Sequence, residues 1–250
     1  ELNNSMSNTK DFISKLTELK KNFKIFIPSV NKEVNATQIN LKQQKDIIST
    51  AVNGVVGALQ FTKAVNDVII DNVDGENFYT FDRVPVLLAL RQQSLGNKVK
   101  DSEDNIVSVD DFVSKAKDVP KFELKKEVSI DSIKVKLKIP TLKDENVILR
   151  RSISEIENLK SDSLSDAMGL IYIFEIVKVI ESVSVGEEEV EFNNLKVADR
   201  FKIIEQLPLE LYDKITGFLS QVTQYDNKIL TNDESTIVID ATLFDATVDA

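Results

Sequence analysis

The sequence predicts an α+β fold that is rich in helices and contains small antiparallel β-hairpins. Three observations support this class. Long stretches repeat apolar residues at helical spacing, shorter stretches alternate apolar and polar residues as strands do, and turn-forming residues separate neighbouring alternating stretches. The 250 residues are 42% apolar, which is enough to fill the core of one large domain or of two small ones.

An amphipathic helix and a hairpin are expected first. Residues 8–19 place apolar side chains at helical spacing. Residues 23–27 then alternate as a strand, which Pro28 ends because proline has no N–H to donate to a sheet. Residues 34–39 are expected to return as the second strand of this hairpin.

Helices are expected to fill the middle of the first half. Residues 42–73 carry one apolar stripe, and Gly54 and Gly57 either divide it into two helices or admit a neighbouring backbone. A further helix is predicted to begin at Asp82, which suits the N-cap position. It is predicted to end before Gly96, which suits the position after the last turn.

The chain is expected to divide near residue 120. Residues 98–100 and 105–109 are predicted to pair, and residues 110–117 to form a short helix, before a Val-Pro pair interrupts the pattern. We therefore expect an N-terminal α+β half, residues 1–120, and a C-terminal α+β half, residues 121–250. The two halves are either separate or packed as one domain.

The second half is expected to begin with strands and to continue with helices. In residues 133–139 apolar residues alternate with three lysines, whose face is expected to be solvated or to guard a sheet edge. A helix over residues 161–182 is expected to bury one stripe of side chains: Leu164, Ala167, Met168, Ile171, Phe174 and Val177. The remaining predictions are a hairpin at 185–192, helices at 196–208 and from Pro208 onward, and a closing strand at 237–239.

Two similar segments suggest a degenerate internal duplication. Ile27-Pro28 and Ile139-Pro140 each end an alternating stretch and are 139 − 27 = 112 residues apart. A long helix and an acidic turn are predicted after each of them. The sequence is therefore interpreted as two degenerate repeats of a strand–hairpin–helix unit, with chance similarity as the alternative, and such a repeat would be a scaffold rather than a catalytic device.

Two apolar segments at the ends of the chain are the candidate interface. Each could add to a neighbouring protein by helix-in-groove packing or strand addition. The alternative is that both pack on the protein's own core. The candidate residues are Phe12, Leu16 and Leu19 near one end and Ile237, Ile239, Leu243 and Phe244 near the other.

The composition excludes most kinds of chemistry. The chain has neither Cys nor His, which removes the thiolate nucleophile, the commonest general base and the commonest transition-metal ligand. Its net charge is 31 − 41 = −10, which argues against binding nucleic acid or an anionic membrane surface. The longest apolar stretch, residues 51–70, is interrupted by polar side chains and predicts a core helix rather than a membrane span.

No catalytic, cofactor-binding or metal-binding residues are therefore predicted. Only 7 Gly are present, and none lies in a dinucleotide-binding or P-loop motif. Carboxylate pairs such as Asp110-Asp111 have polar neighbours, whereas a general acid needs surroundings that shift its pKa. A hydrolase that uses carboxylates or a Ser-Lys pair stays as the enzymatic alternative.

Three segments resemble the small baseplate-hub proteins of T4-type contractile-tail phages. They are "IFIPSVNKEVNATQINLKQQKD" (residues 25–46), "ADRFKIIEQLP" (198–208) and "IVIDATLF" (237–244). The resemblance implies a non-enzymatic structural protein of the virion that is made in the host cytoplasm. It also implies contacts with other baseplate or tail proteins, including copies of the chain itself, and no small-molecule substrate.

A second role is compatible with the same resemblance. An assembly factor would help the hub to form and then leave, whereas a structural component would stay in the virion. The sequence does not separate these two roles.

Overall fold

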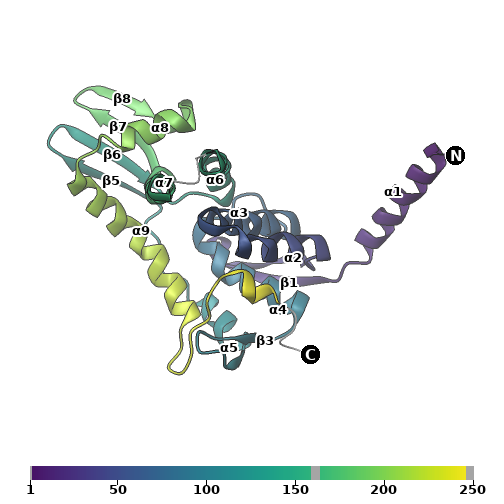
Figure 1. Ribbon diagram of the computed structural model, residues 1–250. Coiled ribbons are helices and arrows are strands. Elements are labelled where there is room, and N and C mark those ends of the chain that lie inside the picture. Colours follow the sequence, from purple (N-terminus) through teal and green to yellow (C-terminus); the bar gives the residue numbers. More distant parts are fainter. Residues whose placement is uncertain (1, 159–163, 246–250) are drawn as a thin grey trace.

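The computed structural model describes residues 2–158 and 164–245 of the chain (Figure 1). Helices dominate, and the strands form two two-stranded sheets and one four-stranded antiparallel sheet, which confirms the predicted α+β class. In the first half the elements are α1 (Leu2–Glu18), β1 (Asn22–Ile27), β2 (Lys32–Thr37), α2 (Leu41–Ile48), α3 (Gly54–Asn72), α4 (Arg83–Leu95), β3 (Lys98–Lys100), β4 (Ile106–Ser108) and α5 (Asp110–Val113). In the second half they are β5 (Lys125–Ile130), β6 (Ile133–Lys138), α6 (Leu142–Glu157), α7 (Leu164–Val177), β7 (Ile180–Val185), β8 (Glu188–Glu191), α8 (Val197–Ile204) and α9 (Leu209–Leu230).

The first hairpin is tied to the start of α4 by a buried carboxylate. Pro28 opens a 3-10 turn between β1 and β2, and Asn31 closes the turn in the left-handed conformation at φ 49°. Asp82 accepts hydrogen bonds from the backbone N–H of Ser29 and of Tyr79, both at 2.8 Å. Asp82 occupies the N-cap position of α4 as predicted, but its side chain does not cap the helix, because its carboxylate oxygens accept from these two earlier backbone N–H groups instead.

Gly54 and Gly57 divide the predicted long helical region into α2 and α3, as the sequence suggested. Gly54 has φ +59°, which an L side chain rarely adopts. A Cβ at Gly57 would lie 2.5 Å from the carbonyl oxygen of Thr50, so only glycine fits this close approach. Asn40 starts α2 with a reciprocal capping box that involves Gln43.

The four-stranded sheet runs β5-β6-β7-β8, and every neighbouring pair is antiparallel. Val135 and Leu137 of β6 are buried, and the lysines of this strand lie on the other face, as the alternation predicts. Lys136 forms an ion pair with Glu189 of β8 at 2.7 Å. The lysine row therefore makes cross-strand ion pairs, in addition to contacting solvent.

Two predictions for the second half need correction. Helix α6 was not predicted, because its first turn carries Asp144 and Glu145 and resembles a charged turn. The side-chain oxygen of Thr141 caps this helix by accepting a hydrogen bond from the backbone N–H of Asp144 at 3.1 Å. Helix α7 ends at Val177 rather than near residue 182, because residues 180–185 pair with β6 as a strand. Met168, expected inside, is exposed.

The two Ile-Pro segments occupy different places in the fold. Ile27-Pro28 leads into the turn of a hairpin, whereas Ile139-Pro140 follows the second strand of a hairpin and leads into α6. The order hairpin–helix–helix does recur, as β1-β2-α2-α3 and β5-β6-α6-α7. An internal duplication thus stays a prediction, and it would align β1 with β5 instead of β6.

The C-terminal segment packs on the first half of the chain. Its predicted strand is absent from the described residues, where only a single bridge joins Thr236 to Thr231 and residues 241–244 form a 3-10 turn. Gln44 donates to the carbonyl of Phe244 at 2.8 Å, and Arg91 donates to the carbonyl of Leu243 at 3.0 Å. These bonds satisfy backbone groups that would otherwise be buried unpaired.

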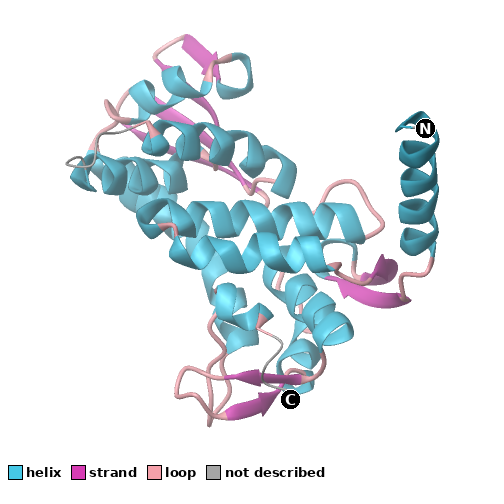
Figure 2. Ribbon diagram, turned by 45° about the vertical axis from the view of Figure 1, so that its right-hand side comes forward, coloured by secondary structure: helices cyan, strands magenta, loops and turns pink. Residues whose placement is uncertain are grey.

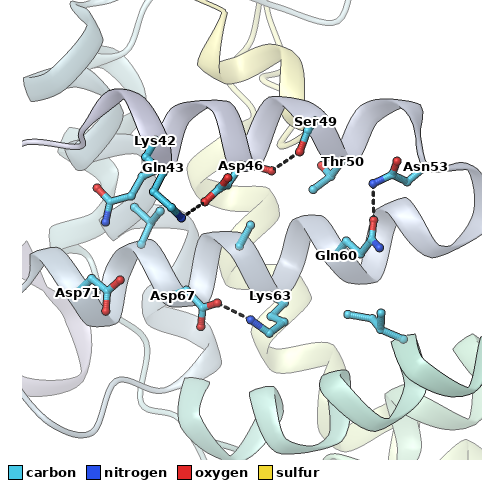
Figure 3. Close-up of a pocket in the computed structure, with 13 residues that line it drawn as sticks. Lys42, Gln43, Asp46, Ser49, Thr50, Asn53, Gln60, Lys63, Asp67 and Asp71 are labelled. Carbon is cyan, nitrogen blue, oxygen red and sulfur yellow. Dashed lines mark hydrogen bonds and ion pairs between the residues drawn. The ribbon is translucent and has the colours of Figure 1, made fainter. Parts of the chain in front are cut away.

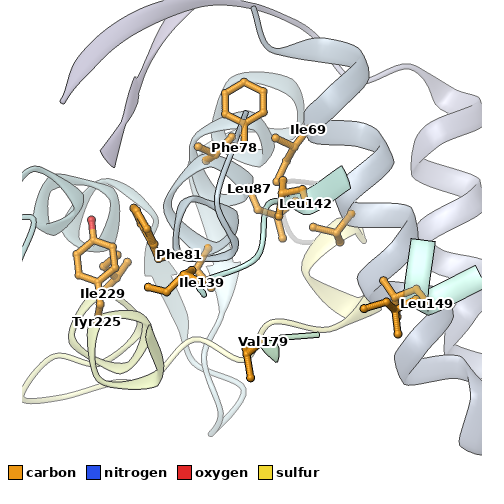
Figure 4. Packing of buried hydrophobic residues seen from close by; sticks show 14 of the residues in the cluster. Ile69, Phe78, Phe81, Leu87, Ile139, Leu142, Leu149, Val179, Tyr225 and Ile229 are labelled. Atoms are coloured by element: carbon orange, nitrogen blue, oxygen red, sulfur yellow. The ribbon is translucent and has the colours of Figure 1, made fainter. Parts of the chain in front are cut away.

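One cluster of buried apolar side chains includes residues from both halves (Figure 4). Ile69 and Leu87 contribute from the first half, and Leu142 and Leu149 from the second. The backbone also links the halves, since the N–H of Leu142 donates to the carbonyl of Phe78 at 2.8 Å. The division into residues 1–120 and 121–250 remains a prediction about folding units, and both units contribute to this core.

Replacing Phe244 tests whether the C-terminal turn belongs to the core. Phe244 is fully buried, so Phe244→Ala should lower the free energy of unfolding by about 3–5 kcal/mol. Leu41→Ala is the control, because Leu41 is exposed and its truncation should change stability by about 0.5 kcal/mol or less. Urea unfolding measures both, and equal effects would contradict the packing described here.

Candidate functional site

The described residues form no group of side chains that would be expected to bind a metal ion. Within residues 2–158 and 164–245 no three Asp or Glu side chains are grouped so that they could hold a metal ion. In the same part of the chain, every helix is too short or too polar to cross a bilayer. The candidate site is therefore sought among polar hollows, buried charges and exposed apolar surfaces.

A hollow of about 560 Å³ lies between α2 and α3 (Figure 3). Asp46 and Asp67 face it, and each is paired with a lysine four residues earlier on its own helix. Lys42 lies 2.7 Å from Asp46, and Lys63 lies 2.5 Å from Asp67. Asp46 is exposed and Asp67 partly buried, and each is already paired with a lysine of its own helix. We therefore interpret the hollow as a solvated polar surface rather than a centre for acid–base catalysis.

A buried polar junction joins three helices and the segment that follows α7. Its centre is Glu145 of α6, whose side chain has no exposed surface. One carboxylate oxygen of Glu145 accepts from Arg83 of α4 and, at 2.9 Å, from Asn66 of α3. The other oxygen lies 3.2 Å from the ammonium of Lys178. Arg83 also donates to the side-chain oxygen of Asn66 at 2.9 Å, so the members of the junction bond one another.

Burying the charged groups of the junction costs free energy. Burial lowers the pKa of Arg83 and of Lys178, since removing a cation from water disfavours its charged form. Nearby carboxylates, Glu175 and Asp226, oppose this shift for both cations. Without Glu145, Arg83 would lose its ion-pair partner and Lys178 would keep only Glu175, which lies 2.5 Å away. Removing one partner of a buried ion pair is strongly destabilising.

Asp226 of α9 lies at the edge of the same junction. Burial raises its pKa to about 7, although Arg83 and Lys178 act in the opposite direction. Among the described residues no hydrogen-bond donor reaches its buried Oδ1. Asp226 therefore carries an incompletely compensated charge near neutral pH.

The N-terminal candidates lie on an exposed helix. Figures 1 and 2 both show α1 standing apart from the rest of the molecule. Phe12, Leu16 and Leu19 are 62%, 52% and 80% exposed, and Ile13 shares their face at 56%. This exposed apolar stripe is therefore the candidate binding face of the N-terminal segment.

The C-terminal candidates lie elsewhere and do not join this stripe. Ile237, Leu243 and Phe244 are buried against the chain's own core, and Ile239 is partly buried beside it. Their geometry is that of the alternative in which the tail packs on its own protein. The structure thus brings the two candidate groups to separate places.

Sequence reasoning did not find the junction. Asn66, Arg83, Glu145 and Lys178 are far apart in the chain, and none belongs to a recognisable motif. The available signal was a polar side chain within an apolar helical stripe, as at Asn66 beside Val65, Val68 and Ile69. That signal indicates a buried polar group but not its partner.

Substituting Asp226 tests the electrostatics of the junction. The folded state holds a proton on Asp226 between about pH 4 and pH 7 that the unfolded state has released, so the contribution of this group to stability falls as pH rises through that window. Asp226→Asn should therefore raise the free energy of unfolding at pH 8 relative to wild type by about 1–3 kcal/mol, and the gain should shrink toward pH 4. Urea unfolding across this range measures it.

The control for this substitution is Asp213→Asn, which changes an exposed carboxylate on the same helix. It should leave the pH dependence of stability close to that of wild type. A gain for Asp226→Asn that is independent of pH would refute the assignment of the effect to titration.

Comparison with known proteins identifies the family. A model of the T4 bacteriophage base plate protein family matches residues 19–242. Neither the curated proteins nor the solved structures that were searched gave a match. The match begins directly after α1 and covers almost all of the remaining chain. The chain therefore belongs to the family of T4 bacteriophage base plate proteins.

Proposed function

We propose that this protein is a non-enzymatic structural component of the hub region of a phage tail baseplate. Membership of the family supports a structural role in the virion tail and interaction with other tail proteins. The finer assignment to the hub is supported by the resemblance of residues 25–46, 198–208 and 237–244 to hub proteins.

The observation that carries the proposed mode of action is the exposed stripe of α1. Phe12, Leu16 and Leu19 present apolar surface on a helix that projects from the body (Figure 2). Burying a large apolar side chain contributes about 1.5–3 kcal/mol. A partner that covers this stripe would therefore contribute free energy that favours holding the protein in an assembly.

The charged groups of the described residues support the same proposal. The most deeply buried carboxylate, Glu145, is fully engaged by Arg83, Asn66 and Lys178. Asp82 is buried as well, and its oxygens are used by two backbone N–H groups. These carboxylates hold the fold together, which favours the structural role over the carboxylate hydrolase.

An assembly factor that leaves the finished hub is the second candidate role. An exposed docking helix serves a transient partner as well as a permanent one, so the two roles differ in the fate of the protein and not in its surface.

The composition of purified virions distinguishes the two roles. A structural component should be present in a fixed whole-number ratio to other baseplate proteins, as measured by quantitative mass spectrometry of phage purified from its host. The protein should also stay with the baseplate when heads and tails are separated. Its absence from finished particles, together with its presence in assembly intermediates, would replace the structural role by that of an assembly factor.

Charged substitutions on α1 test whether its apolar stripe is needed in the assembly. In the double variant Phe12→Asp/Leu16→Asp, two carboxylates would have to be desolvated on docking. The incorporation of the protein into virions should then fall by about tenfold or more. The matched control is Ser14→Asp/Thr17→Asp, which adds the same charge to the other face of the helix and should be incorporated normally. Equal incorporation of both variants would remove α1 from the proposal.

A further inference from the structure

An apolar groove lies between α7 and the α8–α9 corner. Its volume is about 320 Å³, and most of its lining is apolar. The rings of Tyr172 and Tyr212 stack at a centroid distance of 5.0 Å at its wall. The residues that carry the argument are Tyr172, Ile173, Ile176, Leu207, Leu209 and Tyr212.

The groove is open to a partner. Tyr172 is 48% exposed, and Leu209, at the first turn of α9, is 75% exposed. Ile176 forms part of the core beneath. A rigid floor with exposed apolar walls is the arrangement that receives one face of an amphipathic helix.

The charge around the groove favours an apolar helix with basic residues at one end. Glu205 lines the groove, and Glu210 and Asp213 are exposed beside it on α9. The nearby cations are engaged elsewhere, since Lys202 lies 3.2 Å from Asp199 and Lys214 donates to the carbonyl of Ser129 at 2.7 Å. The groove therefore presents acidic groups around an apolar floor.

Helix α1 and the residues that follow it have the complementary character. Within α1, Lys10 and Lys15 balance Asp11 and Glu18, and Lys20 and Lys21 directly after the helix add a charge of +2, in a chain whose net charge is −10. The same segment carries the exposed apolar stripe that includes Phe12 and Leu16. Apolar complementarity would supply the attraction at close range, and the opposite charges would favour encounter and orientation.

The helix is held away from the groove of its own chain. Three residues, 19–21, separate α1 from β1, and they span about 10 Å when fully extended. Strand β1 is fixed to the core by Ile25 and Ile27. In Figures 1 and 2, α1 and the α7–α9 region lie on opposite sides of the molecule.

We propose that α1 of one copy docks into the α7–α9 groove of a second copy. This inference rests on the proposed function, because it names the partner of the docking helix. The contact joins two different surfaces, so the pair of copies would still offer a free groove at one end and a free helix at the other. Repetition of the contact builds a closed ring or an open chain of copies, according to the rotation between neighbours.

The test uses two variants of the full chain that each remove one side of the contact. The helix variant is Phe12→Asp/Leu16→Asp, and the groove variant is Tyr172→Asp/Leu209→Asp. All four side chains are exposed, so neither variant disturbs the core, and circular dichroism checks the fold. Analytical ultracentrifugation should show self-association of wild type with rising concentration, and monomers for each variant alone.

Mixing the two variants gives the decisive measurement. The groove variant keeps an intact helix and the helix variant keeps an intact groove, so an equimolar mixture should form a 1:1 complex that grows no further. The Ser14→Asp/Thr17→Asp control should self-associate like wild type. Raising the salt concentration from about 0.05 M to 0.5 M should weaken every complex, because the charged rim is exposed.

Three results would overturn the proposal. The proposal is contradicted if wild type stays monomeric, if the groove variant still self-associates, or if the mixture of variants stays monomeric. Self-association of the groove variant would point to another receptor surface, such as the exposed face of α2 with Leu41 and Ile48. Virion composition reports separately on the proposed function. If the protein is present in virions but the two variants do not form a complex, only the docking inference is refuted. If the two variants form a complex but the protein is absent from virions, only the structural role is refuted.

Discussion

The arrangement of the two halves depends on the burial of one carboxylate. Glu145 has no exposed surface, and a charge in that position is tolerated only when cations and donors surround it. Arg83, Asn66 and Lys178 supply them from three separate parts of the chain. A shift of α4 or α6 would break the ion pair between Arg83 and Glu145, and a shift of α3 would remove the hydrogen bond from Asn66. The junction therefore favours one packing of α3, α4 and α6 among the many that apolar contacts alone would allow.

The local apolar patterns could be predicted from the sequence, but the distant residues that pack against or pair with them could not. The alternation of residues 133–139 and the helical spacing of α1 both appear in the structure, because each depends only on neighbours in the chain. Helix α6 escaped prediction because Asp144 and Glu145 resemble a turn, and Glu145 is buried only through distant Arg83 and Lys178. Sequence reasoning failed where ion pairs with distant residues place a charged side chain in the interior instead of at the surface.

The two ends of the chain show how similar apolar signals lead to different outcomes. The C-terminal turn is buried because Gln44 and Arg91 donate to its carbonyl groups, so its backbone can leave water without an unpaired acceptor. Helix α1 satisfies its own backbone and leaves only side chains to be covered. Phe12 and Leu16 stand at helical spacing and Leu243 and Phe244 are adjacent, but neither pattern shows whether the side chains are covered. The C-terminal turn is buried because donors in α2 and α4 satisfy its backbone.

A rigid body with one projecting apolar helix suits a protein that acts by holding neighbouring proteins in a fixed arrangement. The buried junction fixes the body, so force applied at one surface is transmitted to the others through packed elements that do not yield easily. The helix stands outside residues 19–242, the region that matches the family. If α1 and the α7–α9 groove do meet between copies, their separation on opposite sides of one body sets the spacing and the rotation of each successive copy. The geometry of an assembly would then follow from the same core packing that Glu145 holds in place.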